Sequence, residues 1–283
     1  MSIVAAVQMA SGPGVGANLQ EVEKLIGRAS AEGARLVVLP ENFAIMGMTE
    51  QDKVKVAERP GAGPIQEFLA RRAAAHRVWI VGGTLPLVSD DPARVYAATL
   101  LFDDQGHQVA RYDKMHLFDV ALEERGENYC ESLTIRPGDR VVVVDTPFGR
   151  MGLAVCYDLR FPELFRCMLD QEAEIIAVPA AFTAFTGRAH WEALVRVRAF
   201  ENLCYIIASA QGGYHYNGRE TYGDSMVVDP WGTILDRLPG GSGIVSASID
   251  RNYLARIRRN FPAVSHRRIY CGPARDRGIG APA

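Results

Sequence analysis

Three side chains whose types together suit acyl transfer each follow a short run that predicts a strand: the carboxylate of Glu41, the ammonium of Lys114 and the thiol of Cys156. The runs are 35–39, 109–113 and 151–155. A carboxylate can take the proton of a thiol, a thiolate can attack a carbonyl carbon, and an ammonium can stabilise the resulting oxyanion. We therefore predict that Cys156 is a nucleophile, with Glu41 as its base and Lys114 as the oxyanion partner.

Two other interpretations of these residues stay open at the level of the sequence. A cysteine after an apolar run is commonly a small core residue. Alternatively, His116 or His190 could pair with Cys156 and lower the pKa of its thiol, as imidazole does in cysteine proteases. The presence of Glu41 and Lys114 at comparable positions favours the first prediction.

The segments around these residues resemble the nitrilase superfamily of carbon–nitrogen hydrolases, from about residue 3 to about residue 268. The segments that carry the resemblance are 40–43 (PENF), 114–119 (KMHLFD), 156–163 (CYDLRFPE) and 186–192 (TGRAHWE). Within the superfamily they look like the Nit amidases. The resemblance implies an α/β fold, specifically a four-layer α-β-β-α sandwich. It also implies that Glu41, Lys114 and Cys156 act without imidazole, so that His116 and His190 are structural and His190 fixes the loop before a helix.

A fourth catalytic residue, Glu131, is implied by the resemblance. Its position matches a second glutamate of Nit-type enzymes, which is expected beside the lysine, where it helps to orient water or the leaving amine. A buried carboxylate there would keep Lys114 charged against the effect of desolvation. The alternative is a surface carboxylate in the charged loop that precedes it.

Substrate contacts are expected from Tyr157, Arg160, Phe182 and Thr186. Arg160 lies four residues after the nucleophile, and its planar guanidinium suits a substrate carboxylate. Phe182 and Thr186 follow the apolar run 174–179 and would supply an apolar wall and a hydroxyl. In the alternative interpretation, Arg160 only forms an ion pair with a neighbouring carboxylate, Asp158 or Glu163.

The resemblance implies an amidohydrolase that cleaves the terminal amide of a small carboxylated substrate to acid and ammonia through a Cys156 thioester. Deaminated glutathione is the first expected substrate, and 2-oxoglutaramate, the substrate of an ω-amidase, is the second. The alternatives are an N-carbamoyl amide hydrolase, a nitrilase and a non-catalytic scaffold of the same fold. Asp113, Arg188 and Asp224 depart from the Nit pattern and bear on specificity rather than on catalysis.

Composition gives expectations about partners and location. The chain has 283 residues with 31 basic and 33 acidic side chains, and a net charge of −2 gives no electrostatic footprint for nucleic acid. The N-terminus has no basic region followed by a long apolar run, so we expect no signal peptide, no membrane span and a cytoplasmic location. Five cysteines without a CxxC pair favour neither disulfides nor zinc. We expect no metal and no cofactor, and a small-molecule amide and water as partners.

The order of elements predicts one domain over residues 1–270 and a C-terminal tail over 271–283. Apolar positions at helical spacing predict a first helix that begins at a capping Asn18, and Pro64 opens a second helix. Strand signals alternate with these helices, which is consistent with two packed sheets flanked by helices. The resemblance implies a homodimer or larger homo-oligomer that assembles through helices near 161–172 and 190–203.

Overall fold

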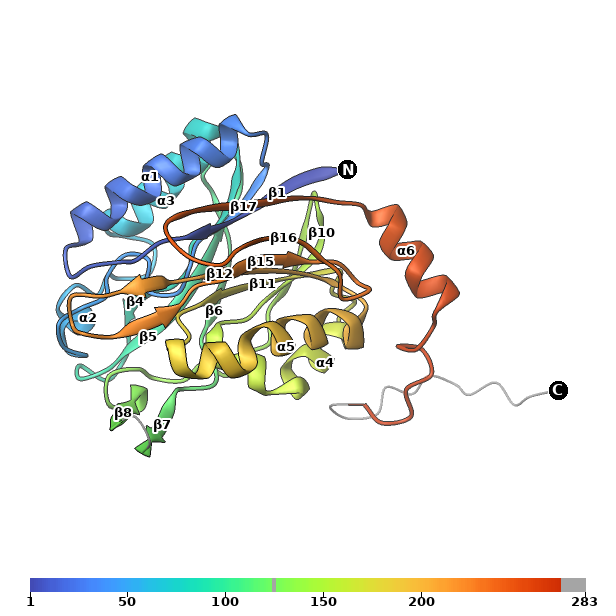
Figure 1. Cartoon of the computed structure of the whole chain (residues 1–283). Helices are drawn as coiled ribbons and strands as arrows, with labels where there is room; N and C mark the ends of the chain where they lie inside the picture. The colour runs from blue at the N-terminus through green and yellow to red at the C-terminus, as the bar shows by residue number, and fades with distance from the viewer. Residues whose placement is uncertain (124–125, 271–283) are drawn as a thin grey trace.

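Two β-sheets lie at the centre of the computed structural model, which describes residues 1–123 and 126–270 (Figure 1). The first is seven-stranded, with the order β17-β1-β2-β3-β5-β4 and with β6 also paired to β5. Its strands are β1 (Ser2–Gln8), β2 (Leu36–Val38), β3 (Trp79–Val81), β4 (Leu85–Val88), β5 (Val95–Phe102), β6 (Gln108–Asp113) and β17 (Gly243–Ile249). The second is six-stranded, with the order β16-β15-β12-β11-β10-β9. Its strands are β9 (Val143–Thr146), β10 (Gly149–Leu153), β11 (Ile175–Ala180), β12 (Tyr205–Ala210), β15 (Ser225–Val228) and β16 (Ile234–Leu238).

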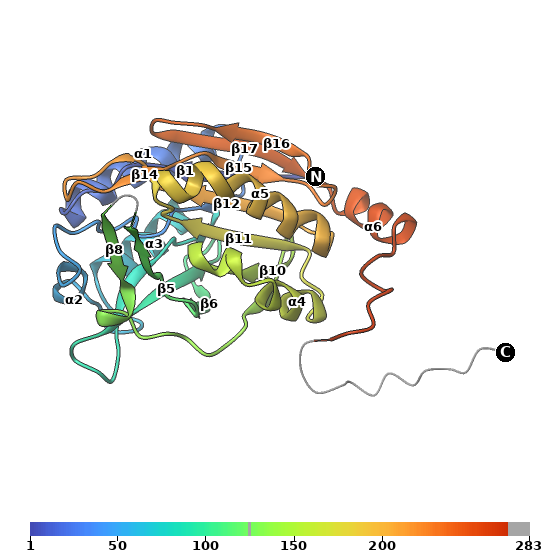
Figure 2. The same cartoon turned by 60° about the horizontal axis from the view of Figure 1, so that its bottom comes forward.

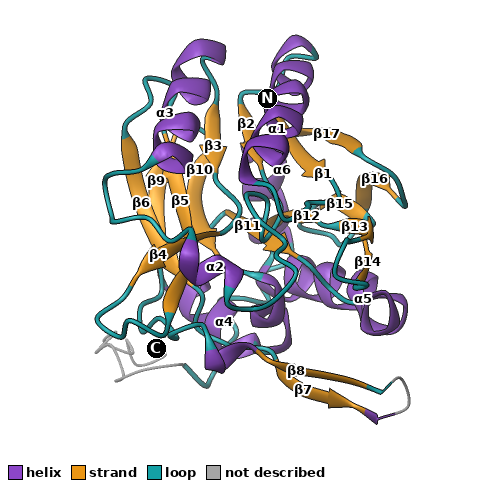
Figure 3. Ribbon diagram, turned by 90° about the vertical axis from the view of Figure 1, so that its left-hand side faces the viewer, coloured by secondary structure: helices purple, strands orange, loops and turns teal. Residues whose placement is uncertain are grey.

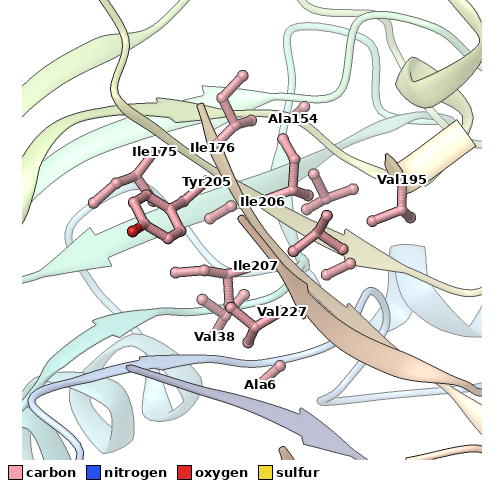
Figure 4. Close-up of a cluster of buried hydrophobic side chains, with 14 of the residues drawn as sticks. Ala6, Val38, Ala154, Ile175, Ile176, Val195, Tyr205, Ile206, Ile207 and Val227 are labelled. Carbon is pink, nitrogen blue, oxygen red and sulfur yellow. The ribbon is translucent and has the colours of Figure 1, made fainter. Parts of the chain in front are cut away.

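Successive side chains of a strand point to opposite faces of its sheet, so every second side chain lies between the two sheets. In β1, Val4 and Ala6 join the apolar cluster shared with the second sheet, whereas Ala5 and Val7 join a separate cluster on the opposite face. This is the period of two that a pleated strand imposes. Figure 4 shows the shared cluster, with Ala6 close to Val227 of the second sheet.

Helices cover the outer face of each sheet (Figures 1 and 2). The first sheet is covered by α1 (Val15–Ala31) and α3 (Pro64–His76), and the second by α4 (Pro162–Asp170) and α5 (Ala184–Asn202). In α4, Leu164, Phe165 and Met168 pack into the core of their own chain. The layer order is therefore α-β-β-α, which confirms the predicted fold class. The remaining helices are α2 (Asp52–Lys55) and α6 (Arg251–Asn260), together with the short 3₁₀ turns η2 (Glu131–Leu133) and η3 (Cys156–Arg160).

The prediction that Asn18 caps the first helix is wrong. The helix begins at Val15, with Gly14 as the capping residue, and Asn18 lies inside it and is buried. The Asn18 amide instead binds the backbone of Gly12 and the carbonyl of Ala44, each at 2.8 Å. A polar side chain that satisfies buried backbone groups of a neighbouring loop cannot be distinguished from a cap by its sequence position alone.

Strand directions bring the predicted site residues to one edge of the molecule. In the second sheet, β10 and β11 are parallel. In the first sheet, β2 and β3 are parallel. β5 is antiparallel to β3, and β6 is antiparallel to β5, so β6 runs in the same direction as β2.

Two hairpins lie outside the sheets: β7 (Asp119–Leu122) with β8 (Glu127–Cys130), and β13 (Gly212–Tyr214) with β14 (Glu220–Tyr222). Figure 3 shows that the first hairpin extends away from the sheets.

The predictions about a membrane span and about the C-terminal tail can be compared with the described residues only. No helix among the described residues has the length and apolar composition needed to cross a membrane. The predicted tail, 271–283, lies outside the described residues. That residues 1–270 form one domain stays a prediction.

Candidate active site

Cys156 stands at a sharp corner between β10 and the turn η3. The backbone is still extended at Val155, with φ −134° and ψ 119°, and it enters the left-handed region at Cys156, with φ +50°. Few residues other than glycine adopt this region, and those that do are found disproportionately at functional sites. The thiol is buried, with 7% of the residue exposed. The structure thus places the sulfur at the end of a strand, as the sequence predicts.

Lys114 joins the two predicted carboxylates. Its Nζ lies 2.7 Å from Oε1 of Glu41, and 2.9 and 2.8 Å from Oε1 and Oε2 of Glu131. Only 1% of the lysine is exposed. The backbone N–H of Phe118 donates a further hydrogen bond of 2.7 Å to Oε2 of Glu131. Glu131 is therefore a buried partner of Lys114 and not the surface carboxylate of the alternative interpretation.

Burial and charge oppose each other in this cluster. Burial alone would lower the pKa of Lys114, but the carboxylates of Glu131 and Glu41 outweigh it and hold that pKa well above its usual value of 10.5. Burial would likewise raise the pKa of Glu131, but the ammonium of Lys114 keeps it below its usual value. Lys114 is therefore a permanent cation and Glu131 an anion at neutral pH.

The Cys156 thiol is held in its protonated form. Burial is the main reason that its pKa lies well above 9.0, and the negative charge of Glu41 adds to the effect, while Lys114 partly opposes it. Glu41 raises the pKa of the thiol, and the backbone of Ala181 lowers it. A resting thiol of this kind needs a base at the moment of attack, and Glu41 is in position to serve.

The turn that carries Cys156 is fixed by Asp158, which the sequence did not identify as functional. Its fully buried carboxylate accepts hydrogen bonds from the Tyr112 hydroxyl at 2.7 Å, the Val155 N–H at 2.8 Å and the His116 N–H at 3.2 Å. Burial, followed by the charge of Asp158, raises the pKa of Tyr112 well above 10.0. An aspartate two residues after the start of a turn is a capping signal that could have indicated this role.

The two histidines do not form a pair with Cys156. Nδ1 of His116 lies 2.6 Å from Oδ1 of Asp158, and its ring stacks on Phe161 with the centroids 3.8 Å apart. His190 is exposed, and its Nδ1 lies 3.3 Å from a guanidinium nitrogen of Arg160. The prediction that His190 fixes the loop before a helix is wrong: α5 already begins at Ala184, and the hydroxyl of Thr183 caps it.

One pocket contains every residue predicted for the site. It is lined by Glu41, Lys114, Glu131, Cys156, Tyr157, Arg160, Phe182 and Thr186. The guanidinium of Arg160 lies over the rings of Phe182 and Tyr157, at 5.4 and 5.8 Å from their centroids. The Thr186 hydroxyl contacts that of Thr183 at 2.8 Å. In the described part of the chain, Arg160 forms no ion pair with Asp158 or Glu163, contrary to the alternative interpretation.

Further lining residues come from segments that the sequence did not connect to the site. They include Phe118 directly before β7, Tyr129 in β8, and Asn217 and Arg219 in the turn between β13 and β14. Asn217-Gly218 is a turn signal, but nothing in it indicates where the turn packs.

The residues that depart from the Nit pattern are absent from the pocket lining. Asp224 accepts hydrogen bonds from Arg237, and Asp113 pairs with Arg111 at 2.8 Å. Arg188 is exposed on α5. None of them supplies a wall of the pocket.

Comparison with known proteins agrees with this geometry. The model of a family described as carbon–nitrogen hydrolase matches residues 3–259. A protein of Yersinia enterocolitica named deaminated glutathione amidase is 43% identical over 267 residues, which cover 94% of this chain and 93% of that protein. The crystal structure of Saccharomyces cerevisiae Nit3, described as a member of branch 10 of the nitrilase superfamily, superposes with a TM-score of 0.85 at 31% identity, covering 95% of this chain and 97% of that chain. The Caenorhabditis elegans NitFhit protein gives a TM-score of 0.88 at 36% identity, covering 94% of this chain and 65% of that longer chain.

Proposed function

Because this chain belongs to the carbon–nitrogen hydrolase family and is therefore a carbon–nitrogen hydrolase, we propose that it cleaves amides through a thioester on Cys156. The observation that supports this most directly is the contact of Lys114 Nζ with both Glu41 and Glu131 in the pocket that contains the thiol. Such a cluster of buried charges is costly to maintain, which also argues against a non-catalytic scaffold.

The proposed reaction has two halves. In the first, Glu41 takes the Cys156 proton, the sulfur attacks the amide carbon, and Lys114 stabilises the oxyanion. Glu41 then returns the proton to the leaving amine as the C–N bond breaks, which leaves the acyl group on sulfur. In the second half, Glu41 takes a proton from water as the water oxygen attacks the thioester carbon. The C–S bond then breaks, Glu41 returns the proton to the Cys156 sulfur and the acid is released, while Glu131 holds Lys114 in place.

Deaminated glutathione is the first substrate that we propose, because relatives with 37–43% identity carry that name. The amides of deaminated glutathione are all secondary, so its leaving group would be an amine with a carboxylate of its own. Ammonia would leave only from a primary amide such as 2-oxoglutaramate, the second proposed substrate. N-carbamoyl amides and nitriles are the remaining alternatives.

The experiment compares purified wild-type protein with Cys156→Ala on all of these substrates. We expect the wild type to release 2-oxoglutarate from deaminated glutathione and to show an acyl adduct on Cys156 by intact-mass spectrometry. Cys156→Ala should be inactive with an unchanged circular dichroism spectrum, because a small side chain at the strand end costs little packing. Full activity of the alanine variant would contradict the thioester mechanism, and turnover of nitriles alone would contradict the amidase assignment.

We further propose that residues 1–270 act as one domain, assembled as a homodimer or larger homo-oligomer in the cytoplasm. The family match over residues 3–259 supports the first part, and Phe200, 46% exposed on α5, supports an interface there. A nucleophilic thiol also favours a reducing compartment. Light scattering of wild type and Phe200→Glu tests the assembly, and a monomeric wild type would contradict it.

A further inference from the structure

A row of aromatic rings crosses the pocket and ends at an arginine on each side. The rings of Tyr129, Phe118 and Tyr157 follow one another, with 5.1 Å between successive centroids. The guanidinium of Arg219 lies 5.2 Å from the Tyr129 ring, and that of Arg160 lies 5.8 Å from the Tyr157 ring. Two cations therefore stand at opposite ends of this aromatic row, and both line the pocket that contains Cys156.

Arg219 has hydrogen-bonding capacity that the described protein does not use. One terminal nitrogen donates to the carbonyl of Ala181, but Nε is buried and without a hydrogen-bond partner. Arg219 forms no ion pair within residues 1–123 and 126–270. A cation with a buried, unsatisfied donor is costly unless an anion completes its contacts, and the planar guanidinium fits a carboxylate.

Arg219 also lies at the boundary between the pocket of Cys156 and a second hollow nearer the surface. This second hollow, lined by parts of both hairpins and of the loop before α2, shares Thr49, Glu50, Asn128, Tyr129, Asn217 and Arg219 with the first. Three carboxylates line this outer hollow, those of Glu50, Glu127 and Glu220. Glu50 pairs with Lys53, Glu127 accepts a hydrogen bond from the Tyr129 hydroxyl, and none of the three forms an ion pair with Arg219 in the described residues. A substrate longer than the inner pocket would extend past Arg219.

We propose that Arg219 binds the carboxylate of the leaving amine, while Arg160 binds that of the acyl part. The inference deepens the proposed function and rests on it, because an anionic leaving amine is what distinguishes deaminated glutathione from 2-oxoglutaramate. Arg160 belongs to the same turn as the nucleophile, η3, whereas Arg219 lies where the pocket continues into the outer hollow. The enzyme thereby selects amides whose amine carries a negative charge, and Arg219 is a specificity-determining residue.

The test compares kcat/KM for deaminated glutathione, for its analogue with the glycine carboxylate capped as an amide, and for 2-oxoglutaramate. In the wild type, the capped analogue should be a poorer substrate than deaminated glutathione by about 10- to 100-fold, the value of a charge-assisted hydrogen bond. Arg219→Gln should lower kcat/KM for deaminated glutathione by a similar factor and leave the other two substrates unchanged. Arg219→Lys should recover part of the loss, because it restores the charge without the planar fork.

A matched control is Arg256→Gln. Arg256 lies at the same 5.2 Å from a tyrosine ring, that of Tyr253, but it is exposed on α6 and absent from the pocket lining. It should leave all three rates unchanged.

Several outcomes would overturn the inference. Equal losses on all three substrates in Arg219→Gln would mean that the arginine only supports the Ala181 backbone. No loss on any substrate, or a wild type that cleaves the capped analogue as fast as deaminated glutathione, would mean that the leaving carboxylate is not recognised. In these cases the proposed function survives. A wild type that hydrolyses neither deaminated glutathione nor 2-oxoglutaramate would overturn both proposals.

Discussion

The carboxylate of Asp158 lies 2.6 Å from Nδ1 of His116 and so joins the turn of the nucleophile to the segment that carries Lys114. The same carboxylate binds the backbone N–H of Val155, directly before Cys156, at 2.8 Å. Neither Asp158 nor His116 lines the pocket. A contact outside the pocket therefore links the turn of Cys156 to the segment of Lys114, which makes Asp158 a positioning residue.

Asp158→Asn tests this role. The asparagine amide has the shape of the aspartate, but it replaces one acceptor oxygen by an NH₂ group. Some of the N–H and O–H groups that donate to Asp158 then lose their acceptor, so we expect the free energy of unfolding to fall by about 1–3 kcal/mol. Displacement of Cys156 should lower kcat more than it changes KM, because substrate contacts outside the turn remain. Urea unfolding and steady-state kinetics measure both effects. Asp139→Asn, whose side chain is 89% exposed, is the control, and a variant with normal kcat would show that the turn needs no such contact.

The choice of base is tested by Glu41→Gln against His190→Ala. Glutamine matches the shape of Glu41 but cannot take a proton, so kcat should fall by about 100-fold or more. His190→Ala should retain most of the activity, because its ring is exposed on α5 and is not bonded to Cys156 in the described structure. An inactive, folded His190→Ala combined with an active Glu41→Gln would replace this mechanism with a cysteine–histidine pair.

The same Glu41→Gln variant should make the Cys156 thiol more acidic while it makes the enzyme slower. The charge of Glu41 raises the pKa of the thiol, so its removal should shift the pH profile of alkylation by iodoacetamide to lower pH. Peptide mass spectrometry can follow Cys156, with the exposed Cys130 as an internal reference. A profile that stays in place, or moves to higher pH, would contradict the charge on Glu41 in the resting enzyme.

The contact of Lys114 with Glu131 stabilises the folded protein only within a defined range of pH. The pKa of Glu131 is lowered from 4.5, so its stabilising effect is present above 4.5 and is lost as the pH falls through the lower folded value. The pKa of Lys114 is raised from 10.5, so its effect is present below 10.5 and is lost as the pH rises through the higher folded value. The difference in unfolding free energy between wild type and Glu131→Gln should therefore shrink in acid, below 4.5. A difference that stays constant in acid would mean that Glu131 is not charged in the folded protein.

The strand ends that carry Glu41, Lys114 and Cys156 could be predicted because local signals agree with the fold. Glu41 and Cys156 follow apolar runs that predict buried strands, Lys114 follows the more polar segment 109–113, and the carboxyl ends of strands in one direction meet at one edge. The position of Glu131 came from the resemblance alone. Its surroundings in the sequence are highly charged and show no apolar alternation, so the β7–β8 hairpin could not be foreseen.

Other parts of the site depend on contacts between distant segments. Arg219 reaches the pocket because the β13–β14 turn lies against the carbonyl of Ala181. Asp158 acts through Tyr112, a residue of β6 in the first sheet, and through His116 in the loop that follows β6. Sequence spacing carries no information about such pairs. The same limit explains why the sequence predicts a cap at Asn18, since the partners of Asn18 in the Gly12 and Ala44 loops are fixed only by tertiary packing.

The role of Arg160 in binding the acyl carboxylate is tested by Arg160→Lys. Lysine keeps the charge but loses the planar fork that matches a carboxylate and the stacking over Phe182 and Tyr157. We expect kcat/KM for 2-oxoglutaramate to fall by about tenfold or more, the scale of one charge-assisted hydrogen bond, while a neutral amide of similar length is little affected. Only the anionic substrate uses the lost contact, so the ratio of the two losses isolates it. Equal losses on both amides would mean that Arg160 supports the turn of Cys156 and that another group binds the acyl carboxylate.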